Sequence, residues 1–106
     1  MPEISQERIQ ELLKEATIDC YDEEEAFSGV VITLAENLHF PLQAEALGNR
    51  VEVIDLLETA SSLRGGVVAQ IRKNGKEYTI GLSQLTFIDP DPESAELLAM
   101  YESWAQ

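Results

Sequence analysis

The hydrophobic pattern of the chain changes its period near residue 40, and this change constrains the fold more than any other feature. Before it, apolar residues recur every three or four positions, which predicts helices. After it, apolar and polar residues alternate, which predicts strands, and helical periodicity returns only near the C-terminus. Apolar residues make up 44% of the sequence, an ordinary share for a globular domain. We therefore expect one α+β domain over residues 1–106.

Two helices are predicted before the change of period. Ser5 suits the N-cap of the first, whose apolar face is formed by Ile9, Leu12, Leu13 and Ala16. The second should begin near Asp22 and end before Pro41, because a residue that precedes proline disfavours helix. Residues 17–21 between them read as a connector or a short strand.

The second half predicts four or five short strands and a last helix. Asn74-Gly75 is a strong hairpin signal, and Gly48-Asn49 reads as a second tight turn. The segments that alternate are 40–46, 51–53, 67–71 and 78–82, with 86–88 as a fifth candidate. This spacing predicts a small, bent antiparallel sheet, an SH3-like partial barrel, packed with two to three helices. Asp91 can cap the last helix, with Pro92 at its first position.

The net charge of the chain limits the classes of partner that the protein can bind. The chain has 20 Asp and Glu against 7 Lys and Arg, a net charge of −13, which disfavours nucleic acid and anionic membrane as partners. Cys20 is the single cysteine, which excludes an internal disulfide and a zinc site built from several cysteines. His39 is the single histidine, which excludes a zinc site built from several histidines. No segment resembles a signal peptide or a membrane span. We expect a cytoplasmic protein whose partners are cations or basic protein surfaces.

Five carboxylates lie within seven residues, and we call residues 19–25 the acidic junction. Its acids are Asp19, Asp22, Glu23, Glu24 and Glu25. Calcium prefers six to eight oxygen ligands, and three-residue spacing places Asp22 and Glu25 on one side of a helix start. The same spacing is that of a capping box, in which these side chains would bind backbone amides instead. Both interpretations stay open on the spacing alone. The junction does not follow the EF-hand pattern, because Glu24 stands where that loop needs glycine.

The junction also resembles the signature of a known family. Ile18-Asp19-Cys20-Tyr21-Asp22-Glu23-Glu24-Glu25 is similar to the opening motif of the small acidic prokaryotic calcium-binding proteins first recognised in cyanobacteria. Further similar blocks follow in order at 36–44, 51–53 and 80–85. The resemblance implies an α+β domain that binds calcium without an EF-hand, with Asp19, Asp22 and the adjacent glutamates as ligands.

The chain departs from this family in two places. Val30-Val31-Ile32 replaces an aromatic-rich stretch of the second helix. The neutral segment Thr59–Leu63 stands where the family has an acidic insertion, so the resemblance does not extend to ligands supplied by that insertion.

Three functions are compatible with these observations. The first is a calcium buffer or sensor, with Asp19, Asp22 and Glu25 as main ligands and Glu23 and Glu24 as supporting charge. The second is an acidic interaction module that docks on a basic protein without a metal. The third, a small enzyme with paired carboxylates, requires Asp19 and Glu25 to converge in a cleft; we expect no enzyme.

Overall fold

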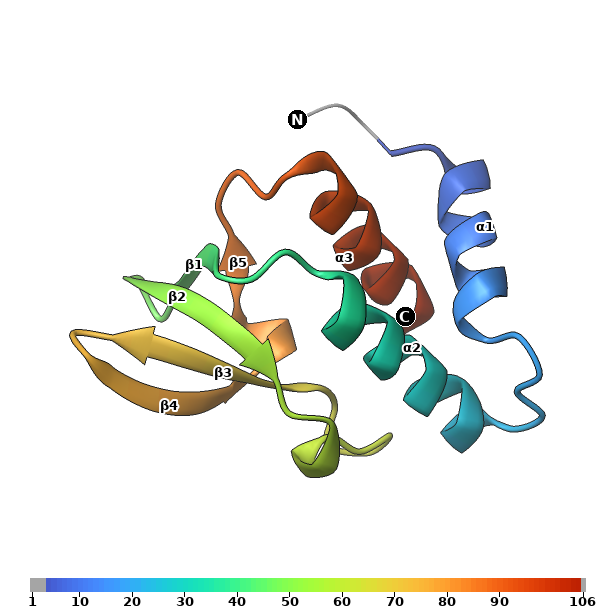
Figure 1. The fold of residues 1–106 in the computed structure, drawn as a ribbon, viewed down its shortest axis with the longest axis horizontal. Coiled ribbons are helices and arrows are strands. Elements are labelled where there is room, and N and C mark those ends of the chain that lie inside the picture. Colours follow the sequence, from blue (N-terminus) through green and yellow to red (C-terminus); the bar gives the residue numbers. More distant parts are fainter. Residues whose placement is uncertain (1–3, 106) are drawn as a thin grey trace. The chain divides into compact units, whose positions relative to one another are not determined.

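The computed structural model describes residues 4–105 of the chain. They form three α-helices and one antiparallel sheet of five strands, which confirms the predicted α+β class. The chain divides into two compact units, a helical unit of Met1–Leu38 with Asp91–Gln106 and a sheet unit of His39–Pro90 (Figure 1). The expectation of a single domain over residues 1–106 stays a prediction. Within residues 4–105, no helix combines the length and apolar character that crossing a bilayer requires.

The helical unit contains α1 (Gln6–Ala16), α2 (Glu23–Asn37) and α3 (Pro92–Ala105). Each helix contacts the other two. The larger buried side chains of this unit are Ile9, Leu12, Phe27, Val30, Val31, Leu34, Leu97, Met100 and Tyr101. They recur at the helical spacing expected from the sequence, so the apolar faces form a common core.

Two helix starts follow the predicted capping chemistry. The backbone N–H of Arg8 donates to Ser5 Oγ at 3.2 Å, which caps α1. The backbone N–H of Ser94 donates to Asp91 Oδ2 at 3.1 Å, which caps α3 just ahead of Pro92. Each bond satisfies an amide that has no partner inside its own helix.

A side-chain bond also joins α1 to α3. Arg8 Nε donates to Glu96 Oε2 at 3.1 Å, and Arg8 Nη1 donates to Glu11 Oε2 at 3.3 Å. The hydrogen bonds to Glu96, first, and to Glu11 raise the pKa of Arg8 above its ordinary value. This partly exposed ion pair adds a polar contact between the two helices.

The sheet unit contains β1 (Leu42–Ala46), β2 (Asn49–Leu56), β3 (Val68–Lys73), β4 (Lys76–Gly81) and β5 (Thr86–Phe87). The strand order is β4-β3-β2-β1-β5, and all pairings are antiparallel. The fifth candidate strand is therefore present as β5, and it pairs antiparallel with β1. The sheet is open, with β4 and β5 as its edges (Figure 1).

The alternation of the sequence is reproduced on the two faces of the sheet. Val53 lies opposite both Leu42 and Ile71, and all three side chains are buried. The neighbouring row on the other face is polar and joins Glu52, Arg72 and Glu77 across three strands. A face of each kind is what a half-buried antiparallel sheet requires.

Two local predictions need correction, the position of the first tight turn and the start of the first strand. The first tight turn is at Leu47-Gly48, one residue earlier than predicted, with φ angles of 52° and 79°. Leucine rarely adopts positive φ, so its sequence gave no turn signal. The first strand begins at Leu42 rather than at residue 40, whereas the second helix ends at Asn37, before Pro41 as predicted. Residues 17–21 form a connector, one of the two predicted alternatives, with a turn at residues 17–19.

Candidate metal centre

The acidic junction occupies the connection between α1 and α2. Asp19 lies in the turn that follows α1, with a φ of 58°, a left-handed conformation that aspartate tolerates better than most residues. Asp22 is the N-cap residue of α2, and its backbone is extended. The three glutamates form the first turn of α2, and all five acids are exposed.

Two of the five acids bind backbone amides. The backbone N–H of Glu25 donates to Asp22 Oδ1 at 2.8 Å. The Glu25 side chain reaches back, and its Oε2 accepts from the backbone N–H of Tyr21 at 2.9 Å. The capping interpretation of Asp22 and Glu25 is therefore correct in this structure. Each carboxylate uses one oxygen in this way, so its second oxygen is available to another ligand.

The connector is held against α2 by close packing. The Sγ atom of Cys20 donates to the backbone carbonyl of Glu25 at 3.3 Å. One turn further along α2, Gly29 faces the end of α1, and a Cβ atom at Gly29 would collide with the carbonyl oxygen of Ala16. The absence of a side chain at Gly29 is what lets the end of α1 approach α2 this closely. These contacts position the backbone of the acidic junction.

The structure does not gather the junction into a closed cage. Among the described residues, no three of its five carboxylates bring oxygen atoms within 4.8 Å of one another. Among the described residues, the side chains of Asp19, Glu23 and Glu24 make no hydrogen bond. The predicted ligand set thus consists of two carboxylates held by hydrogen bonds to backbone amides, Asp22 and Glu25, and three without such bonds.

The electrostatics favour a cation at this place once capping is accounted for. The N-terminus of a helix carries a partial positive charge, which stabilises a nearby carboxylate by about 0.3–1 kcal/mol. Capping requires one carboxylate, and the helix dipole stabilises one or two. Five adjacent negative charges, in contrast, repel one another. The candidate metal ligands here are the carboxylate oxygens of the acidic junction and the peptide carbonyl oxygens beside them. Calcium prefers oxygen ligands of these two kinds.

Two large apolar side chains flank the acids. Ile18 is 71% exposed and Tyr21 is 87% exposed. The sequence pattern had not marked either as a surface feature, because β-branched and aromatic residues in a connector also suit a short strand. Together they place apolar area directly beside the carboxylates.

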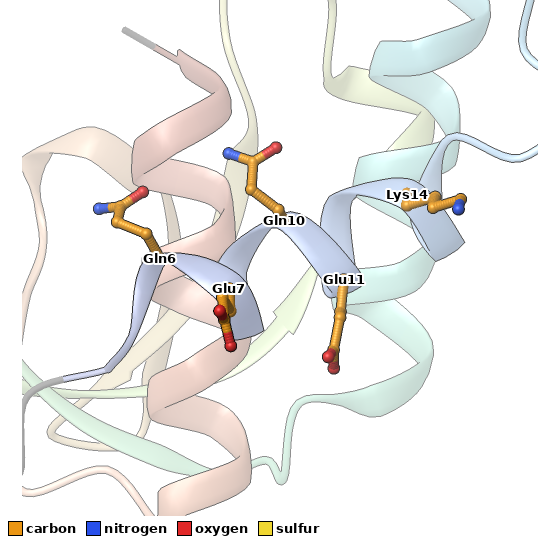
Figure 2. Close-up of a pocket in the computed structure, with 5 residues that line it drawn as sticks. All are labelled: Gln6, Glu7, Gln10, Glu11 and Lys14. Carbon is orange, nitrogen blue, oxygen red and sulfur yellow. The ribbon is translucent and has the colours of Figure 1, made fainter.

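A separate depression lies on the exposed side of α1 (Figure 2). It is shallow and is lined by Gln6, Glu7, Gln10, Glu11 and Lys14. Because all five side chains come from one helix, the depression does not enclose a ligand.

Gly29 and Ala16 are the positioning residues that sequence reasoning missed. A glycine inside a helix normally destabilises the helix by about 1 kcal/mol. The presence of such an unfavourable residue was the only sequence signal that position 29 has a structural role. The partner atom, a backbone carbonyl of α1, carries no sequence signature.

Comparisons with known proteins agree with this fold. The model of a family described as calcium binding, CcbP, matches residues 7–105. A crystal structure of CcbP from Anabaena is 24% identical, with a TM-score of 0.80 over 99% of this chain and 94% of that one. A calcium binding protein in its calcium-binding form is 21% identical, with a TM-score of 0.74 over 98% and 94% of the two chains. At these identities the two structures show a common fold. No curated protein matches the sequence.

Proposed function

The chain belongs to the CcbP family of calcium-binding proteins, and we propose that it holds its ion at the acidic junction. The family is one of calcium-binding proteins and not of enzymes. We assign Asp19, Asp22 and Glu25 as the main ligands and Glu23 and Glu24 as supporting charge.

The paired placement of Asp22 and Glu25 is the observation that carries this assignment. The hydrogen bonds of 2.8 Å and 2.9 Å hold both carboxylates at the first turn of α2, each with one oxygen unused. Ordering these two side chains in advance removes part of the entropic cost of binding an ion. Asp19 lies in the adjacent turn and adds a third carboxylate.

Calcium also relieves a cost that the free protein bears. Five carboxylates within seven residues repel one another, and a divalent cation removes much of this repulsion. A ligand at 100 times its dissociation constant stabilises the native state by about 2.7 kcal/mol. For a domain of this size, that corresponds to a rise in melting temperature of roughly 10 °C.

The placement is tested by calorimetric titration of calcium into the wild type, Asp22→Asn, Asp19→Asn and Glu25→Gln. Each variant removes one negative charge with almost no change of shape, and asparagine still caps a helix. We expect each to weaken calcium binding by about tenfold or more.

Glu36→Gln is the matched control, because it removes the same charge from the exposed far end of α2. It should bind calcium nearly as the wild type does. If Glu36→Gln and the junction variants weaken binding equally, the ion responds to total charge and the assignment is wrong. Binding by all four variants with wild-type affinity would place the site elsewhere in the chain.

A second function is favoured by the exposed side chains of Ile18 and Tyr21. We propose that the acidic junction, when free of calcium, docks on a basic protein surface that also offers apolar contact. Such a partner would compete with calcium for the same carboxylates, which is how a sensor rather than a buffer would work. Its binding should weaken with any added salt, because exposed charge pairs are screened.

We also propose that the protein works in the cytoplasm. Cys20 is the only cysteine and has a free thiol, which suits a reducing compartment.

A further inference from the structure

One edge of the sheet offers a strand long enough to accept a further strand. β4 forms this edge with six residues, whereas β5 at the opposite edge has only two (Figure 1). Lys76, Glu77, Tyr78 and Thr79 are all exposed, and the side chain of Tyr78 is 50% exposed. Tyr78, Thr79 and Ile80, three consecutive residues at the centre of the strand, are strong strand formers.

The hairpin geometry determines which backbone groups of β4 point outward. Asn74 and Gly75 both have positive φ, as in a two-residue type I′ loop, so Lys73 and Lys76 close the hairpin as a hydrogen-bonded pair. Hydrogen-bonded pairs then alternate along the ladder, and the bond from the N–H of Leu82 to the carbonyl of Val67, 2.8 Å, continues the series.

Glu77 and Thr79 therefore direct their N–H and C=O groups away from β3. Within residues 4–105, these backbone groups have no hydrogen-bond partner in the chain. An open edge with unpaired groups is a template for another strand, and proteins commonly block such edges. Lys76 is charged but lies at the very start of β4, so it does not block the centre of the strand.

We propose that a second copy of the chain pairs with this edge, antiparallel and about a twofold axis at Tyr78. In this register the outward groups of Glu77 meet those of Thr79 of the second copy, and the reverse pair forms by symmetry. Each pair supplies two backbone hydrogen bonds. Tyr78 then lies opposite Tyr78 of the second copy in a non-hydrogen-bonded position, where side chains approach most closely.

The side chains on both faces suit this register. On one face, the Glu77 carboxylate accepts from Gln70 Nε2 at 2.6 Å and from Arg72 Nη2 at 3.4 Å. Arg72 thus offsets the charge of Glu77 where two copies would bring these acids near each other. On the other face, the two tyrosine rings meet and are flanked by Lys76 and Ile80, which add cation–π and apolar contact.

The charge distribution favours the sheet unit over the helical unit as the surface through which two copies associate. The helical unit has 14 Asp and Glu against 2 Lys and Arg, a net charge of −12. The sheet unit has 6 against 5, a net charge of −1. Two copies that meet through β4 bring together the nearly neutral unit of each. Residual repulsion between the helical units should make the dimer stronger at higher salt.

The expected dimer is weak. One pair of short edge strands buries less than the roughly 1,200 Å² of a standard stable interface, so the dimer should form reversibly at high concentration. Sedimentation velocity of the full chain, up to about 1 mM in about 0.5 M NaCl, should show a shift from monomer to dimer. Chelator is present throughout, so that calcium plays no part.

Thr79→Pro is the diagnostic variant. It removes an N–H that points outward and leaves the ladder bonds to β3 intact, which an edge strand tolerates. By symmetry the dimer loses two hydrogen bonds, and we expect its dissociation constant to rise about 30-fold. The circular dichroism spectrum of the monomer should be unchanged.

Tyr78→Lys tests the side-chain contact without altering the backbone, should Thr79→Pro not fold. Its matched control is Ile32→Lys, which makes the same charge change at another half-exposed apolar residue on α2. Tyr78→Lys should weaken the dimer, and Ile32→Lys should not. A wild type that stays monomeric under these conditions, or a dimer indifferent to both Thr79→Pro and Tyr78→Lys, would overturn the proposal. So would a monomer that captures only an unrelated extended peptide.

Discussion

Replacing Gly29 with alanine sets two opposing effects against each other in α2. Alanine is a better helix former than glycine by about 1 kcal/mol, so propensity alone predicts a more stable protein. The new Cβ atom, however, would overlap the carbonyl oxygen of Ala16 at the end of α1. Overpacking of this kind costs about 1–3 kcal/mol, and the obstacle here is backbone, which yields less readily than a side chain.

We expect the collision to outweigh the propensity, so that Gly29→Ala lowers the free energy of unfolding by about 1–2 kcal/mol. For a chain of this length, that is a fall in melting temperature of roughly 5–10 °C, measured by calorimetry in the presence of chelator. Ser28→Ala is the matched control, since Ser28 is an exposed neighbour in the same helix. It should leave stability unchanged or raise it slightly. A Gly29→Ala protein more stable than the wild type would refute the close approach of α1 and α2.

Three further substitutions test local features of the fold. Leu47→Asn should raise stability by about 1 kcal/mol, because Leu47 is 89% exposed with a φ of 52°, a conformation that asparagine adopts at lower cost; a loss of stability in urea unfolding would contradict this. Ser5→Ala should lower stability by about 1 kcal/mol through loss of the α1 cap, and Ser5→Asp should restore it. Asp22→Ala should lower stability by a similar amount in chelator, whereas Asp22→Asn should not, and equal effects of the two would argue against the cap.

Much of the fold could be predicted from periodicity and capping residues. The helix starts at Ser5 and Asp91 were predictable because a cap is a local interaction between residues three apart. The hairpin at Asn74-Gly75 was predictable for the same reason, because these two residues readily adopt positive φ. The turn at Leu47 was not, since the pairing of β1 with β2 imposes a conformation that leucine itself disfavours.

The candidate site shows where sequence reasoning stops. Spacing placed Asp22 and Glu25 on one side of a helix start, but the same spacing serves a capping box and a pair of metal ligands. In the structure one oxygen of each accepts a backbone hydrogen bond, which supports the capping interpretation and does not exclude an ion at the second oxygen. The contact between Gly29 and Ala16 depends on how two helices pack, which no local pattern contains.

The most direct test of the proposed site is a calcium titration followed by the amide resonances of the isotopically labelled wild-type protein. The account predicts that the largest saturable shifts occur at residues 19–26, where the ion would meet the acidic junction and the first turn of α2. Matched additions of a monovalent salt should not reproduce them. Saturable shifts that are largest elsewhere, with the amides of Tyr21 and Glu25 unmoved, would contradict the assignment of the ion to this junction.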